Sequence, residues 1–113
     1  MPKRAFGQTN LDFGLVKLVK DLLHIDTFIE TGTGWGITTS MAAKHFSRVF
    51  TVELNPDKHA GAVQKHRHLK NITFHLGDTD EYLPKMLDEA GDVPCVFFLD
   101  AHCMFGRPFG VTA

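Results

Sequence analysis

The residues best suited to bind a ligand are three glycines at alternate positions, Gly32, Gly34 and Gly36, which follow closely after Glu30. The apolar run before them is typical of a short buried strand, and the run after them is typical of the start of a helix. A turn from strand to helix that packs against a ligand needs positive φ angles and leaves no room for a Cβ atom. We therefore expect a flat or polar ligand to lie against this backbone.

The spacing of the glycines indicates which ligand. A dinucleotide-binding turn has the pattern Gly-x-Gly-x-x-Gly and holds a pyrophosphate at the helix N-terminus. Here the third glycine comes one residue earlier, and the carboxylate of Glu30 would repel a pyrophosphate but attract an amino group. An ordinary tight turn between a strand and a helix is the alternative.

The run Glu-Thr-Gly-Thr-Gly-Trp-Gly from Glu30 to Gly36 resembles the first motif of class I S-adenosylmethionine (SAM)-dependent methyltransferases. The resemblance implies that the acid and the glycine loop lie against the methionine part of the cofactor. The residues that it assigns to the cofactor here are Glu30, Gly32, Thr33, Gly34, Trp35 and Gly36.

Acidic residues also follow the other expected strands. Glu53 ends a strand roughly twenty residues beyond the glycine loop, and Asp78 and Asp100 follow the next two strands. In a parallel sheet the carboxyl ends of the strands lie along one edge, where open α/β sheets bind ligands. There Glu53 can accept hydrogen bonds from both hydroxyls of a ribose, and Leu54 can pack on an adenine. A solvated acid at the end of the strand is the alternative for Glu53.

The run Leu-Gly-Asp-Thr from Leu76 to Thr79 resembles a later motif of the same family. The resemblance implies that the Asp78 carboxylate accepts from the adenine amino group, and that the backbone N–H of Thr79 meets a ring nitrogen. The competing interpretation is structural, because Asp78 with Glu81 also forms a capping-box pattern for the next helix.

The run Phe-Phe-Leu-Asp-Ala-His from Phe97 to His102 resembles the fourth-strand motif of small-molecule and sugar O-methyltransferases. The resemblance implies that Asp100 faces the cofactor's transferable methyl group, in some members with a divalent metal; no metal site is predicted here. Asp100 and His102 can then act as a general base on a substrate hydroxyl, since histidine titrates near neutral pH. A surface loop position is the alternative for His102.

The elements that must position these residues alternate regularly. Strands are expected at about residues 26–31, 48–54, 71–76 and 93–100, with helices at about 11–23, 37–46, 56–69 and 79–90. This alternation predicts right-handed βαβ units in a three-layer, Rossmann-like α/β sandwich, with a parallel sheet of about four strands in the order 3-2-1-4. In the first helix a stripe at helical spacing, widened by Val16, Val19 and Leu23, is expected to cover one face of the sheet: Leu11, Leu15, Leu18 and Leu22.

Two histidines in the expected third helix, His66 and His68, are not expected to bind zinc. They lie two residues apart, which points them to different faces of a helix, and the neighbouring Lys65 and Arg67 repel a cation. The polar helix is expected to be a solvated face, or to touch an acidic partner weakly.

Length and composition indicate one domain over residues 1–113, with residues 1–10 as a loose arm and 104–113 as a C-terminal tail. A net charge of -1 gives no general attraction to nucleic acid or to an acidic membrane. The sequence contains no transmembrane run or signal peptide, so a cytoplasmic location is expected. Cys95 and Cys103 are too few for a disulfide framework and are expected to be reduced.

The resemblance ends after the fourth expected strand. A complete class I methyltransferase has a seven-stranded sheet, so this chain is expected to be truncated relative to that fold. Its fourth strand would then be an exposed apolar edge that pairs with another chain. The sequence therefore predicts a homo-oligomer that buries Phe97, Phe98 and the tail from Phe105 to Phe109.

Three functions are consistent with these patterns. The first is a SAM-dependent methyltransferase, or its cofactor-binding half, that acts on an oxygen of a small-molecule or sugar acceptor. The second is a non-catalytic SAM- or nucleoside-binding module. The third is an NAD-type Rossmann enzyme, which the early third glycine and Glu30 disfavour.

Overall fold

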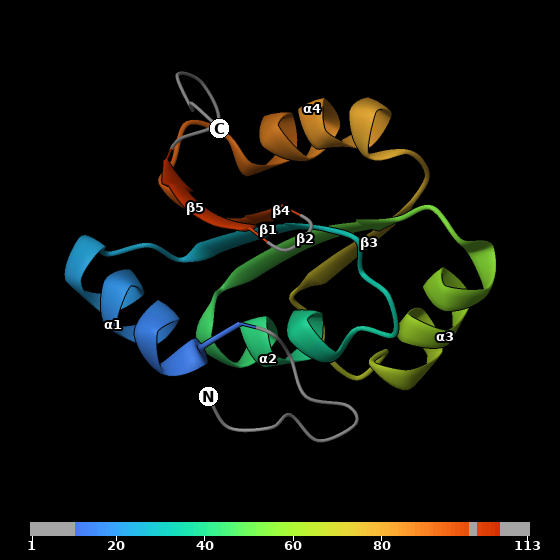
Figure 1. Cartoon of the computed structure of the whole chain (residues 1–113), viewed down its shortest axis with the longest axis horizontal. Coiled ribbons are helices and arrows are strands. Elements are labelled where there is room, and N and C mark those ends of the chain that lie inside the picture. Colours follow the sequence, from blue (N-terminus) through green and yellow to red (C-terminus); the bar gives the residue numbers. More distant parts are fainter. Residues whose placement is uncertain (1–10, 100–101, 107–113) are drawn as a thin grey trace.

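A five-stranded sheet forms the middle layer of the protein (Figure 1), in the order β3-β2-β1-β4-β5. The structure is a computed structural model and describes residues 11–99 and the backbone of residues 102–106. The strands are β1 Thr27–Thr31, β2 Arg48–Glu53, β3 Ile72–Leu76, β4 Cys95–Leu99 and β5 His102–Gly106. The helices are α1 Phe13–Leu23, α2 Ile37–His45, α3 Pro56–Lys65 and α4 Thr79–Ala90.

The four predicted strands are parallel and lie in the predicted order. Helices α1, α2 and α3 lie on one side of the sheet and α4 on the other, which confirms the three layers (Figure 1). None of the helices in the described part of the chain is long and apolar enough to span a membrane.

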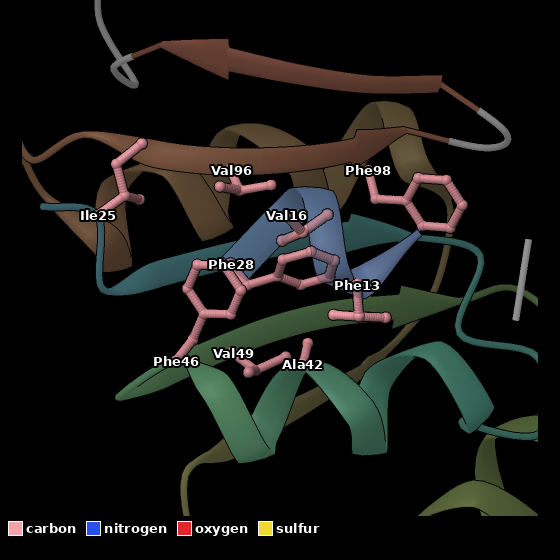
Figure 2. Packing of buried hydrophobic residues seen from close by; sticks show 9 residues of the cluster. All are labelled: Phe13, Val16, Ile25, Phe28, Ala42, Phe46, Val49, Val96 and Phe98. Carbon is pink, nitrogen blue, oxygen red and sulfur yellow. The ribbon is translucent and has the colours of Figure 1, made fainter. Parts of the chain in front are cut away.

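Alternation along the strands supplies two cores, one on each face of the sheet. Phe28 is in register with Val49 and Val96, and these side chains pack under α1 and α2, as Figure 2 shows. The next residue, Ile29, faces the other side, where a second cluster packs against α4. Because the central strands are covered on both faces, all five residues of β1 are buried.

The edge of β4 differs from the prediction. Strand β5 pairs with β4 in the antiparallel direction, from Leu99 opposite His102 to Cys95 opposite Gly106. Residues 104–106, expected in a tail, therefore belong to the sheet. Strand β5 pairs with the edge of β4 that would otherwise be open. The prediction that the chain forms an oligomer through an exposed β4 edge was therefore wrong about that edge.

The side of α1 that faces the sheet agrees with the prediction only in part. Val16, at the margin of the predicted stripe, is buried, but so is Phe13, which was not part of the stripe and lies 6.3 Å from Phe28 between ring centroids. The predicted stripe lies largely outward, with exposed side chains at Leu15, Leu18, Leu22 and Leu23. Both sets of residues have helical spacing, so spacing alone could not decide between them. The bulky ring of Phe13 fills the space beside Phe28, and the helix is oriented accordingly.

The orientation of α1 leads to a matched pair of substitutions. We expect Val16→Ala to lower the free energy of unfolding by about 1–2 kcal/mol, since Val16 lies within the first core. Leu22→Ala removes a more exposed side chain and should change the free energy of unfolding by less than about 0.5 kcal/mol. Urea denaturation measures both. The reverse order of losses would mean that the leucine stripe faces the sheet.

Candidate functional site

The glycine loop lies at the carboxyl edge of the sheet, between β1 and α2. Gly32, Gly34 and Gly36 have φ angles of 84°, 58° and 84°, which explains why three glycines stand there. The backbone N–H groups of Gly32 and Thr33 both donate to the carbonyl of Val52, at 2.8 and 3.1 Å. The loop is therefore docked on the end of β2.

Glu53 holds the loop from the same strand end. Its Oε1 accepts a hydrogen bond from the backbone N–H of Gly34 at 2.7 Å, and its Oε2 accepts from the N–H of Asn55 at 3.0 Å. Two oxygens of a carboxylate offer about four acceptor positions, so both oxygens can accept further bonds. Leu54, the next residue, has a side chain that is 69% exposed. Both predicted nucleoside-binding residues thus lie beside the loop, and their contacts with a cofactor stay predictions.

Glu30 lies inside the protein, with an exposed fraction of 1%. Its Oε1 accepts hydrogen bonds from the hydroxyls of Thr39 on α2 and Thr51 on β2, the latter at 2.8 Å. The Thr51 hydroxyl also lies 2.6 Å from that of Thr33 in the loop. Burial raises the pKa of Glu30 to about 7; the two threonine hydrogen bonds oppose this rise, and the charge of Glu53 adds to it.

The network of Glu30 gives this residue an observed structural role. It connects β1, β2, α2 and the loop through hydroxyl groups, while the amino-group contact that the sequence suggested stays a prediction. A carboxyl group with a pKa of about 7 is partly protonated at neutral pH, so its negative charge is reduced there.

Asp78 and its neighbours extend the site along the edge. The backbone N–H of Gly77 donates to the carbonyl of Glu53 at 2.9 Å, which places Asp78 close to the end of β2. The Asp78 side chain accepts from the N–H of Asp80 at 2.8 Å and caps α4, which confirms the Asp78 half of the predicted capping box. Glu81 pairs with Lys85 at 3.4 Å. The adenine contacts of Asp78 and Thr79 stay predictions.

The predicted catalytic pair is only partly within the described structure. Asp100 lies outside the described residues. His102 begins β5 opposite Leu99, the last residue of β4, so its backbone lies at the same carboxyl edge as the loop. The general-base role of these two residues stays a prediction. Among the described residues, no group of three or more His, Cys, Asp or Glu side chains could hold a metal ion.

Helix α3 makes contacts with the loop that the sequence analysis missed. The ring of Trp35, whose side chain is 53% exposed, lies against Gly61, where a Cβ atom would stand 2.7 Å from the indole. His66, expected on a solvated face, is only 8% exposed and lies beside Gly36. A usable signal was the pair of small residues Gly61 and Ala62, which permits close approach one turn before His66.

The buried carboxyl of Glu30 predicts an effect of pH on stability. Its pKa is raised from 4.5 to about 7, so its contribution to stability is fully present below about pH 4.5 and is lost as pH rises through about 7. Glu30→Gln keeps an oxygen that accepts from Thr39 and Thr51 but carries no charge. We expect Glu30→Gln to remove this loss of stability. Above neutral pH its free energy of unfolding should exceed that of the natural protein by up to about 3 kcal/mol.

The measurement is the free energy of unfolding by urea at about pH 5 and about pH 8. Glu81→Gln is the matched control, because Glu81 is an exposed acid and should leave the pH dependence unchanged. An equal pH dependence in Glu30→Gln and the natural protein would contradict the raised pKa.

No family model matches the sequence. The chain is 32% identical over 80 residues to protein-L-isoaspartate O-methyltransferase 1 of Anaeromyxobacter sp. (strain Fw109-5), in a match that covers 66% of this chain and 38% of that protein. Among solved structures, the O-methyltransferase TomG from Streptomyces achromogenes, in complex with SAM, matches with a TM-score of 0.63 and 24% identity, over 77% of this chain and 42% of that one.

The O-methyltransferase from Bacillus cereus, in complex with S-adenosylhomocysteine (SAH), matches with a TM-score of 0.64 and 18% identity, over 86% of this chain and 47% of that one. The chain thus spans less than half the length of each of these three proteins. The glycine loop, the strand order and these matches lead to one conclusion: the chain is similar to class I SAM-dependent methyltransferases and has a Rossmann-like fold that matches part of theirs.

Proposed function

We propose that this chain binds SAM at the carboxyl edge of the sheet and forms the cofactor-binding half of a SAM-dependent methyltransferase. The observation that carries the proposal is the bond of 2.7 Å between the N–H of Gly34 and the Glu53 carboxylate. It fixes a glycine loop beside a carboxylate that has acceptor positions left for a ribose.

The loop also offers room for the cofactor. A Cβ atom built on Gly32 or Gly34 would meet no atom within 4 Å, so this side of the loop faces open space. In the proposed complex the methionine part lies against these glycines, Glu53 accepts from the ribose hydroxyls, and the exposed side chain of Leu54 packs on the adenine. Two of the matched proteins were solved with SAM or SAH, which supports this choice of ligand.

In the proposed reaction the chain's main contribution is positioning. SAM held by the glycine loop and Glu53 would supply a methyl group, which an acceptor oxygen would take in line as the C–S bond breaks and SAH leaves, so alignment would account for much of the rate. Asp100 and His102 are the proposed groups that take the proton from the acceptor hydroxyl. The three matched proteins are named as O-methyltransferases, which supports oxygen as the acceptor atom, here on a small molecule or sugar.

The remaining expectations on partners and location are part of the proposal. A net charge of -1 favours a small-molecule acceptor over nucleic acid. A cytoplasmic location and assembly with a second copy are also retained, without the β4 edge as the interface. Light scattering of the purified chain tests the assembly, and a monomer at micromolar concentration would remove it.

The proposed function predicts selective binding. Calorimetric titration should show that SAM and SAH bind and that NAD does not. Glu53→Ala loses the bonds to the loop and the proposed ribose contacts, so we expect it to weaken SAH binding by about 1–3 kcal/mol. The matched control is Glu81→Ala on α4, an exposed acid paired with Lys85, which should bind SAH like the natural protein.

The outcomes separate the candidate functions. Unchanged affinity in Glu53→Ala would remove this residue from the site, and binding of NAD in place of SAM would favour a nucleotide enzyme. Binding of SAM without methyl transfer to any acceptor in a screen of small hydroxyl compounds would support the non-catalytic module.

A further inference from the structure

The side of the glycine loop that faces α3 is closed by a histidine. Gly36 is the N-cap residue of α2, with a φ of 84°. A Cβ atom there would stand 2.7 Å from Cδ2 and 3.1 Å from Nε2 of His66, and 3.3 Å from the Cβ of Ala62. The imidazole therefore touches the backbone of Gly36 directly. This contrasts with Gly32 and Gly34, whose equivalent positions are open.

The residue before Gly36 is held by the same helix. The backbone of Trp35 acts to raise the pKa of His66, so it lies close to this ring, and the Trp35 ring lies against Gly61. Two successive loop residues thus have their position set by α3, which is capped at its start by Asn55 and ends at the buried His66. A rigid support of this kind is what a loop needs in order to bind a ligand without first being ordered.

The charge of His66 matters because of where the ring lies. In the described part of the chain its Nε2 is buried and has no hydrogen-bond partner. A neutral ring tolerates this as an acceptor, whereas a protonated ring would bury a charged donor without a partner. Burial lowers the pKa of His66, and the positive charges of Lys65 and His68 lower it further, against the opposing effect of the Trp35 backbone.

We propose that neutral His66 is a positioning residue, which holds Trp35 and Gly36 in the conformation that binds the cofactor, so that its protonation weakens cofactor binding. The inference rests on the proposed function for its ligand and on the loop contacts for its mechanism. Because the pKa of His66 in the folded protein lies below its ordinary value of 6.5, the closed loop is favoured at neutral pH, and this preference is lost as pH falls below that value.

The first experiment follows the loop without any ligand. Trp35 is the one tryptophan of the chain, so its fluorescence reports on this segment alone. Between about pH 7.5 and about pH 5 we expect its emission to change in the natural protein, with a midpoint below the ordinary histidine pKa. His66→Gln, which has an amide donor but does not titrate in this range, should lack the change.

The control for this experiment is His68→Gln. His68 is exposed, and its ring lies 6.5 Å from that of His66. The variant should retain the transition. Because it removes a positive charge that lowers the pKa of His66, any movement of the midpoint should be upward.

The second experiment measures SAH binding across the same pH range by calorimetry. In the natural protein the affinity should fall by up to about tenfold for each pH unit below the pKa of His66, the limit for one proton. His66→Gln should lose this part of the pH dependence, whatever its affinity at neutral pH. Equal pH profiles in the two proteins would overturn the proposal, since a merely structural histidine would alter affinity at all pH values.

A third experiment tests the contact itself. Gly36→Ala and Gly32→Ala impose the same φ of 84° on alanine, but only the first drives a Cβ atom into His66. We expect Gly36→Ala to lower the melting temperature more than Gly32→Ala, and adding His66→Ala to both should narrow this gap, since only the contact with the Cβ of Ala62 then remains. An unchanged gap would show that His66 does not support Gly36.

The experiments distinguish the two proposals. If SAH fails to bind at any pH while the Trp35 transition and the coupling to Gly36 are present, then the proposed function fails and the loop support stands. If SAH binds with an affinity whose pH dependence survives His66→Gln, then the proposed function stands and the positioning role fails.

Discussion

The hydrogen bonds between the glycine loop and the end of β2 are the constraint on which the site depends. Val52 and Glu53 receive the N–H groups of Gly32, Thr33 and Gly34, so the loop after β1 is held by its neighbour in the sheet. These bonds exist only because β1 and β2 are parallel and in register, with Thr31 opposite Val52. The geometry of the proposed cofactor site thus follows from strand pairing, and the strand pairing follows from the apolar residues that both helical layers cover.

Much of the fold was predictable, for a reason that also explains the failures. Continuous apolar runs alternating with helical patterns specify a parallel sheet, and that part is confirmed. The orientation of α1 was predicted only in part, because Val16 and Leu18 both belong to the expected stripe and only packing against Phe28 distinguishes the buried residue from the exposed one. Strand β5 was missed because its ladder with β4 is a long-range backbone interaction, for which its short, mixed sequence gives little signal.

The candidate site, like the fold, was predictable only in part. The placement of Glu53 and Asp78 at one edge follows from topology, because parallel strands bring their carboxyl ends together. The burial of Glu30 follows from parity along β1, since it lies two residues from Phe28 and shares its face of the sheet. His66 itself gave no such signal, because a histidine among charged residues in a polar helix is typical of an exposed surface. The small residues Gly61 and Ala62 only indicated that something packs closely there, and the loop that lies over His66 makes it buried.

The enclosure of Glu30 has a kinetic consequence. With the group 1% exposed and its Oε1 bonded to Thr39 and Thr51, there is little water beside it to accept its proton. Exchange of its proton with solvent would therefore require a local opening of the structure around it. After a sudden pH jump, this carboxyl would follow at the rate of that local opening, far more slowly than an acid at the surface. For that interval, Glu30 would keep the protonation state that it had at the previous pH.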